Sequence, residues 1–341
     1  MSDSTSESFL QRHSRDVAER LIRQMEEGTG PFVQPWDARM DLGLPMNPTT
    51  GKSYRGGNLL HLWALQTAWD VKDNRWMTYK QAAAVGAQVR KGEKACVIEY
   101  WDWTPVEEAK KSGDPELIAK AHPKVFFPRV FNASQIDGLP DLVLATPRPE
   151  PEIHQACEKV IRDSGAVIHY DGGNQAFYRP MTDSIHLPER HAFDSASGFY
   201  VTVLHELAHW SGFPSRLNRP MKGGFGSEDY AKEELVAEVS SMLMGERLGI
   251  GHDPAQHAAY VKSWIKILRD DPREIFRAAA AAERVVEFLK VPEFEHEPLA
   301  KVEREQTSVA ANRQELEKPN DEKVRAKGRA KTKQREHVMV A

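Results

Sequence analysis

The stretch VTVLHELAHWSG, residues 201–212, contains two histidines four positions apart, His205 and His209, with Glu206 directly after the first. Residues at positions i and i+4 lie on the same face of an α-helix, so the two imidazoles can reach one metal ion. Most other residues of the stretch are apolar, and Gly212 is a typical helix stop. The stretch therefore predicts a buried helix that binds a metal through two histidines.

The order of the residues in HELAH is typical of zincins, in which the two histidines bind zinc. Glu206 cannot readily join the same coordination shell, but it can lie against the metal-bound water and act as a general base. Zinc lowers the pKa of that water to about 7, which provides hydroxide near neutral pH. Such a pattern also arises by chance in roughly one chain of this size in a hundred. The surrounding apolar helix makes the chance explanation weaker.

A third ligand is expected on a helix predicted around KEELVAEVSSM, residues 232–242, because catalytic zinc sites usually have three protein ligands. Glu234 and Glu238 share one face of that helix. We assign Glu234 as the third ligand and Glu238 as the residue that orients a ligand histidine. The exchange of these two roles is an open alternative, as are two solvated carboxylates and manganese in place of zinc. Four further histidines lack comparable spacing and are interpreted as surface or core residues: His186, His191, His252 and His257.

The chain of 341 residues is long enough for two domains and a tail. Residues 8–140 are predicted to combine helices with a small sheet, and a proline-rich linker follows at 141–151. Residues 152–290 contain extended runs and then helices, including the metal-binding one. Residues 291–341 are highly charged and are predicted to be disordered, with a basic stretch at 323–335 that is either solvated or a weak nucleic-acid contact. The sequence therefore predicts an α+β fold with two domains.

The pattern of apolar residues predicts several individual helices and strands. A helix is predicted over residues 8–27, and the extended runs at 94–103 and 125–132 are predicted to pair as strands. The extended segment TDSIHLP, residues 182–188, precedes the metal-binding helix. We expect this segment to be an edge strand along which an extended peptide substrate lies.

Overall charge does not indicate a nucleic-acid binder, since the formal net charge is −4. Residues 52–94, however, contain eight Lys or Arg against three Asp or Glu, interleaved with aromatic residues. Aromatic rings can stack on unpaired bases while cations track phosphates, which suits single-stranded nucleic acid. The candidate DNA-binding residues are Tyr54, Arg55, Asn58, Arg75, Trp76, Lys80, Lys91 and Lys94.

The aromatic residues of this window are expected to divide between core and surface. Trp63 and Trp69 fall on the apolar side of a predicted helix and are expected in the core. Tyr54, Arg55 and Trp76 lie in loops and are expected to be exposed.

The cellular compartment follows from what the sequence lacks. The two cysteines, Cys96 and Cys157, have neither the spacing of a disulfide framework nor that of a cysteine zinc site. The N-terminal segment is polar, and no apolar run is long enough for a signal peptide or a membrane span. We therefore expect a cytoplasmic protein without a membrane partner.

Several motifs together resemble the ArdC antirestriction proteins. These motifs are NPTTGKSYRGGN, RWMTYKQA, VRKGEKA and VFNASQIDGLP in the first half, and HELAHWSGFPSRLNR and EELVAE in the second. The resemblance covers residues 8–290. It implies a single-stranded-DNA-binding domain followed by a zincin-like metallopeptidase domain, in proteins of conjugative plasmids or phages that protect incoming DNA from restriction. His205, Glu206 and His209 correspond to the family's HExxH, and Glu234 or Glu238 to its downstream glutamate.

Three hypotheses for the function remain open at this stage. The first is a zinc metallopeptidase recruited to DNA, where it cleaves a DNA-associated protein. The second is a single-stranded-DNA-binding protein in which zinc is structural, and the third is zinc hydrolysis of a non-peptide bond. Neither a phosphate-binding glycine loop nor an acidic cluster for paired magnesium ions is evident, so helicase and nuclease functions are disfavoured.

Overall fold

The computed structural model describes most of the first 293 residues, and these belong to one compact unit. The predicted disorder of the charged tail concerns residues that lie, with few exceptions, outside the described ones. The described residues are 7–29, 43–143, 148–221, 224, 226–252, 259–293 and 298–299.

The first helix, α1 (Phe9–Glu26), lies where the apolar spacing predicts it. The Ser8 side chain accepts a hydrogen bond from the backbone of Gln11, whose side chain in turn accepts one from the Ser8 backbone. This capping box satisfies two backbone N–H groups that the first turn would otherwise leave unpaired. Val17 and Leu21 recur at helical spacing and are both 1% exposed, so this face of α1 lies in the core.

The first half continues with α2 (Gly56–Ala68) and several short antiparallel strand pairs. The predicted pairing of residues 94–103 with 125–132 is confirmed, since Cys96 lies opposite Val130 and Tyr100 opposite Phe126. The remaining elements of this half are β1 (Met46–Asn47), β2 (Lys52–Ser53), β3 (Trp76–Thr78), α3 (Tyr79–Ala84), β4 (Gln88–Val89), β5 (Cys96–Val97), β6 (Tyr100–Asp102), α4 (Thr104–Ser112), α5 (Pro115–Lys120), β7 (Lys124–Phe126), β8 (Arg129–Asn132) and β9 (Ile136–Asp137).

The second half combines a three-stranded sheet with five α-helices among its described residues. Its elements are α6 (Glu150–Ser164), β10 (Val167–His169), β11 (Phe177–Arg179), β12 (Ser184–His186), α7 (Ala196–Ser211), α8 (Glu228–Leu248), α9 (Val261–Asp270) and α10 (Glu274–Phe288). In this sheet β12 pairs in parallel with β10 and antiparallel with β11, so it is the middle strand. The expectation that residues 182–188 form an edge strand is therefore wrong. Strand order depends on pairing between distant segments, which the alternation of residues within one segment does not reveal.

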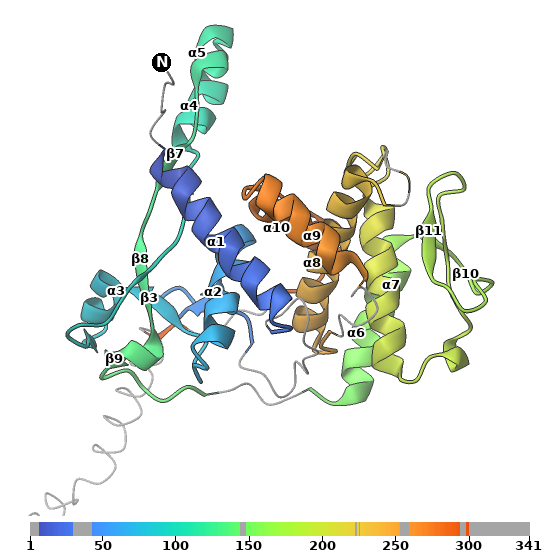
Figure 1. Ribbon diagram of the computed structural model, residues 1–341, viewed down its shortest axis with the longest axis horizontal. Coiled ribbons are helices and arrows are strands. Elements are labelled where there is room, and N and C mark those ends of the chain that lie inside the picture. Colours follow the sequence, from blue (N-terminus) through green and yellow to red (C-terminus); the bar gives the residue numbers. More distant parts are fainter. Residues whose placement is uncertain are drawn as a thin grey trace, which may run out of the picture. The chain divides into compact units, whose positions relative to one another are not determined.

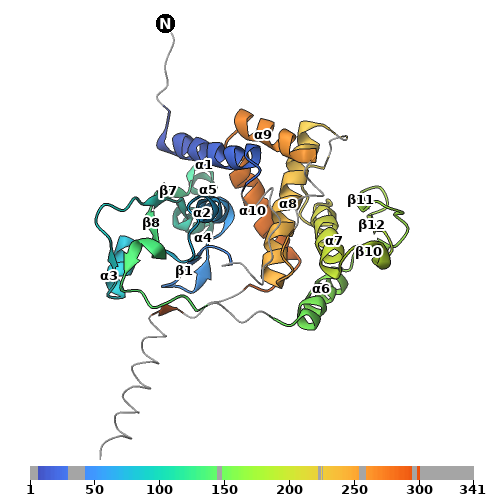
Figure 2. The ribbon, with the colours of Figure 1, turned by 60° about the horizontal axis from the view of Figure 1, so that its bottom comes forward.

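The helices of the second half are arranged around α8. Figure 2 shows α8 between α10 and α7, with the small sheet on the other side of α7, and Figure 1 shows the same neighbours from another direction. The core runs through both halves, because Leu60 of α2, Leu235 of α8 and Val285 of α10 belong to one cluster of buried apolar residues. Within the described part of the chain, no helix combines the length and the apolar character that a membrane span requires.

Contacts between α2 and α10 join the two halves. Arg55, directly before α2, forms an ion pair with Glu283 of α10 at 3.2 Å, and Arg247 at the end of α8 binds the same carboxylate at 3.1 Å. Gly57 of α2 lies so close to the ring of Phe276 that a Cβ atom there would be 2.1 Å from the nearest ring carbon. The close approach of the two helices therefore depends on a residue without a side chain at position 57.

Gly57→Ala is expected to lower the free energy of unfolding by about 1–3 kcal/mol, because the added methyl group overlaps the Phe276 ring in a filled core. Urea denaturation of the wild type and the variant measures this loss. In a Phe276→Leu background the same substitution should cost less, since the ring that it meets is absent. An equal loss in both backgrounds would contradict the proposed overlap.

Candidate metal centre

The two histidines lie on a helix whose sequence places it in the core. The Ser195 side chain caps the start of α7 by accepting a hydrogen bond from the Gly198 backbone at 3.0 Å. Every residue of this helix from 199 to 211 is buried. The opposing helix α8 is capped in the same way by Ser227, directly before it, and is followed by Gly249 in the left-handed conformation. Both helices are therefore defined by local signals, and their packing brings their polar side chains together.

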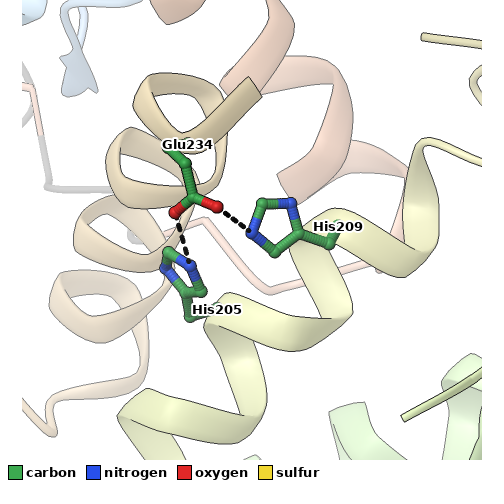
Figure 3. A group of neighbouring side chains, drawn as sticks. All are labelled: His205, His209 and Glu234. Carbon is green, nitrogen blue, oxygen red and sulfur yellow. Dashed lines mark ion pairs between the residues drawn. The ribbon is translucent and has the colours of Figure 1, made fainter. Parts of the chain in front are cut away.

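Figure 3 shows His205 and His209 on consecutive turns of α7 pointing toward Glu234 of α8. Glu234 Oε2 is 3.6 Å from His205 Nε2, and Glu234 Oε1 is 3.5 Å from His209 Nε2. One donor atom from each residue lies within 4.8 Å of the others. Donor atoms that share a tetrahedral zinc ion at about 2 Å are about 3.3 Å apart, so the donor set fits such an ion.

A second layer of side chains holds the two histidines. His209 Nδ1 lies 3.4 Å from Glu233 Oε1, and Arg219 donates to both oxygens of Glu233 at 2.6 and 3.0 Å. His205 Nδ1 lies 3.7 Å from Glu238 Oε2. Carboxylates placed on the second nitrogen of a ligand histidine orient its ring and raise its basicity. Glu233 and Glu238 are positioned to do this for the two histidines.

His252 completes this layer, although its sequence position suggested no role. Its Nε2 lies 2.9 Å from Glu238 Oε1, and both residues are almost fully buried. The expectation that Glu238 lies behind a histidine is compatible with this geometry. The alternative in which both Glu234 and Glu238 are solvated is wrong, since they are 4% and 0% exposed.

Burial and neighbouring charges shift the pKa values of this cluster. Burial raises the pKa of Glu206, although the nearby histidines oppose the shift. Burial alone would raise the pKa of Glu234, but the hydrogen bond from His205 and the charge of His209 lower it to about 2. Burial would lower the pKa of His209, and its contacts with Glu233 and Glu234 outweigh this and raise it to about 9. The shifts of His209 and Glu234 favour the protonated imidazole beside the ionised carboxylate, and because a ligand histidine binds metal in its neutral form, metal ions and protons compete for the site.

A cavity of about 430 Å³ opens beside the donor set. Glu206 lies in its wall together with His205, His209 and Glu234, and Phe177 and Tyr178 of β11 line another side. The strand next to the donors is therefore β11, an edge strand of its sheet, rather than residues 182–188. Tyr230 and Tyr260 also line the cavity, with their hydroxyl oxygens 3.1 Å apart, and burial raises the pKa of both.

Two of the candidate DNA-binding residues lie in the core of the first half. Trp76 is 0% exposed beneath Leu62 and Leu65 of α2, so the expectation that its ring is available for a base is wrong. Arg75 is 7% exposed and is bound by Asp73 at 2.7 Å. The expectation that Trp69 lies in the core is also wrong, because α2 ends at Ala68 and leaves Trp69 41% exposed. Trp63, expected in the core as well, is partly buried against it.

The other candidate DNA-binding residues differ in whether their side chains already contact other residues of the protein. The Tyr54 hydroxyl donates to the Trp76 carbonyl at 2.9 Å, and Asn58 exchanges two hydrogen bonds with the Glu99 backbone. Arg55 is about half exposed but pairs with Glu283 and Glu287. Three candidates are exposed and form no ion pair with any residue that the structure describes: Lys80, Lys91 and Lys94.

Comparison with known proteins covers both halves. Residues 11–131 match the N-terminal domain of the anti-restriction factor ArdC, and residues 155–281 match a zincin-like metallopeptidase family. The crystal structure of the antirestriction ArdC protein from plasmid R388, in its metal-free form, is 34% identical with a TM-score of 0.64. The match covers 81% of this chain and 96% of that one. The chain belongs to the ArdC family.

Other relatives of this ArdC-family chain have different lengths. Two DNA primases called TraC from Escherichia coli are 51% and 48% identical over 80% and 91% of the chain, but only 19% and 30% of the primases is covered. The chain thus spans about a fifth to a third of their length. An uncharacterised protein, y4eC, from Sinorhizobium fredii is 35% identical over 80% of the chain and 90% of that protein.

The ArdC family membership confirms the resemblance and the α+β fold with two domains. A zincin-like domain indicates a metal ion but does not identify it. The structure of R388 ArdC with Mn(II), with a TM-score of 0.65, shows manganese in that protein.

Several residues of the site escaped the sequence analysis. Arg219 and His252 lie in connections between helices, where no periodicity marks a buried position. Glu233 was visible as one of three carboxylates on its helix, but its partner Arg219 was not. Tyr230 lies four residues before Glu234 on α8, and this spacing places both residues on one face of the helix.

Metal analysis of two variants is expected to separate the roles of Glu234 and Glu238. Glu234→Gln should lose stoichiometric metal, because a neutral amide replaces a proposed ligand. Glu238→Gln should keep one metal ion per chain with about 10–100-fold weaker affinity, as is usual for the partners of ligand histidines. Metal titration with a chromophoric chelator measures both, and the opposite result would mean that the two roles are exchanged.

Proposed function

We propose that this ArdC-family chain is an antirestriction protein that binds single-stranded DNA and cleaves a DNA-associated protein. It would protect incoming plasmid or phage DNA in the cytoplasm of the recipient cell. The observation that carries the proposal is the group of His205, His209 and Glu234, which shares one cavity with Glu206. A metal-donor set, a general base and space for a substrate are thus within one site.

The donor set suits zinc, with manganese as the alternative. Two imidazoles and one carboxylate are the ligands of a common type of catalytic zinc site. A divalent ion held there supplies Lewis acidity, which polarises a carbonyl group and makes water more acidic. Glu233 and Glu238, behind the histidines, keep the two rings in the orientation that binding needs.

The chain's own groups provide the remaining chemistry. Glu206 accepts a proton from water as the water attacks the peptide carbonyl, and then returns the proton to the leaving amine. Its raised pKa makes it a stronger proton acceptor than an exposed carboxylate. Tyr230 and Tyr260 stay protonated because their pKa values are raised, and their hydroxyl groups can donate to a developing negative charge.

The substrate is proposed to be an extended peptide segment. An edge strand offers unpaired backbone groups to such a segment, and β11 borders the cavity. Structural zinc sites usually have four protein ligands and no open position. Three donors beside a cavity of about 430 Å³ therefore favour catalysis over the purely structural alternative.

Single-stranded DNA is proposed to lie on the first half of the chain. Lys80, Lys91 and Lys94 are exposed and can track phosphates. Arg55 can join them only by exchanging its contacts with Glu283 and Glu287. Trp76 and Arg75 are excluded from this set, since both are buried.

Glu206→Gln is expected to keep one metal ion per chain but to lose protection of transformed DNA in a restricting host. The amide cannot accept a proton, and loss of a general base typically slows hydrolysis by about 10²–10⁴-fold. The transformation efficiency of unmodified plasmid measures protection. Glu228→Gln, the same change at an exposed position of α8, is the matched control. Full protection by Glu206→Gln would exclude a hydrolytic mechanism.

Replacing Lys80, Lys91 and Lys94 together by Ala is expected to weaken binding to single-stranded DNA. The slope of log K against log salt should fall in magnitude by about 2, because each phosphate contact on a single strand contributes about 0.7. Fluorescence anisotropy at several salt concentrations measures the slope. Lys120→Ala, at an exposed position of α5, should leave the slope unchanged. An unaltered slope in the triple variant would place the phosphates elsewhere.

A further inference from the structure

A second cavity, of about 200 Å³, lies in the first half of the chain between α1, α2 and β5. It shares no lining residue with the cavity beside the metal donors. Neither the proposed hydrolysis nor the proposed phosphate contacts use it. Its lining includes Phe9, His13 and Arg20 of α1, His61 of α2, Trp69 and Cys96.

Three buried nitrogen atoms of this lining have no hydrogen-bond partner among the described residues. They are His13 Nε2, Arg20 Nε and His61 Nδ1. His13 and His61 are 7% and 5% exposed, so bulk water does not satisfy them. Glu99 Oε1 lies 4.0 Å from His13 Nε2, which is beyond hydrogen-bond range. Buried polar atoms are nearly always paired in native proteins. These three nitrogens have almost no accessible surface of their own, so a ligand in the cavity would pair with them only after the side chains that cover them shift.

The two histidines of the cavity are neutral near pH 7. Burial, assisted by the charge of Arg20, lowers the pKa of His61 to about 3, and burial also lowers the pKa of His13. A neutral imidazole has one donor and one acceptor nitrogen. Asp16, which also lines the cavity, disfavours an anion. A ligand with a mixed donor and acceptor edge fits these groups better than a phosphate does.

Cys96 does not make this cavity a second hydrolytic site. Its sulfur lies 3.0 Å from His61 Nε2, a spacing that resembles a nucleophile and its base. Burial, however, raises the pKa of the thiol to about 12, so no thiolate is available near neutral pH. The pair is a neutral contact in the wall of a binding cavity.

The remaining lining is apolar and includes two aromatic rings, and cationic side chains lie beside the cavity. Trp69 and Phe9 are 41% and 49% exposed, so ring surface is accessible at the cavity. Arg12 also lines the cavity, and the exposed Lys94 directly precedes its lining residue Ala95. A flat ligand that carries a phosphate outside the cavity would find a ring to stack on and a cation for the phosphate.

We propose that this cavity holds one unpaired nucleobase of a bound DNA strand, with its edge against His13, Arg20 and His61 and its face on Trp69. Proteins that bind single strands commonly combine hydrogen bonds to base edges with stacking on aromatic side chains. The proposal rests on the proposed binding of single-stranded DNA. It adds a base-binding site to the phosphate contacts of the exposed lysines.

The test compares two polymers of about twelve units, a thymidine oligonucleotide and the same backbone with abasic sites only. Both carry the same phosphates, and only the first carries bases. Trp69→Leu should weaken binding of the thymidine oligonucleotide about tenfold, the effect expected for one lost stacking contact, and leave the abasic polymer unaffected. His61→Leu should act in the same direction. Anisotropy at low salt measures all affinities on the full chain.

Trp103→Leu is the matched control, because Trp103 is 54% exposed and does not line the cavity. It should bind both polymers as the wild type does, and thermal unfolding should show that all variants are folded. Equal binding of the oligonucleotide by Trp69→Leu and the wild type would overturn the cavity proposal alone. If the wild type bound neither polymer, the proposed binding of single-stranded DNA would itself be overturned. Thymidine monophosphate binding as tightly as the oligonucleotide would show that the ligand is a free nucleotide instead.

Discussion

Three carboxylates on one buried helix impose the strongest constraint on this structure. Glu233, Glu234 and Glu238 of α8 are 7%, 4% and 0% exposed. Burying a carboxylate without a partner is strongly unfavourable, so each needs a hydrogen-bonding or cationic group beside it. The two histidines of α7 meet this need from one side. Arg219 and His252 meet it from the connections between helices. The candidate metal centre therefore forms part of the contact between α7 and α8 inside the second half.

The two halves of the chain are joined by α10. This helix packs against both α8 and α2, and its Glu283 pairs with Arg55 on one side and Arg247 on the other. The buried apolar cluster is continuous from α2 to α7, so relative movement of the halves would expose apolar surface. The proposed DNA-binding half and the proposed hydrolytic half therefore form a single packed body over the described residues up to 293.

What the sequence predicts correctly is mostly local, such as the helices that carry His205 and His209 and, on the facing helix, Glu234 and Glu238. The spacing of each pair follows from the helical period, and their roles as ligands stay a prediction. The errors concern contacts between distant segments. Trp76 begins β3, which passes beneath α2, and only the packing of these two elements decides that it is buried while Trp69 is exposed. The middle position of β12 depends on pairing with β10 and β11, and the partners of Glu233 and Glu238 come from loops. No pattern within a single segment contains this information.

The edge position of β11 determines which targets the proposed peptidase can use. A strand edge accepts only a segment that is already extended, so a target that is folded at the cleavage point cannot pair with it. Such a site selects by conformation more than by side-chain identity. Selection among proteins would then come from co-localisation, because a target on the same DNA strand has a high effective concentration at the site. Under the proposed function, the open edge beside the cavity would make proximity on DNA, rather than a sequence motif, the main determinant of which protein is cut.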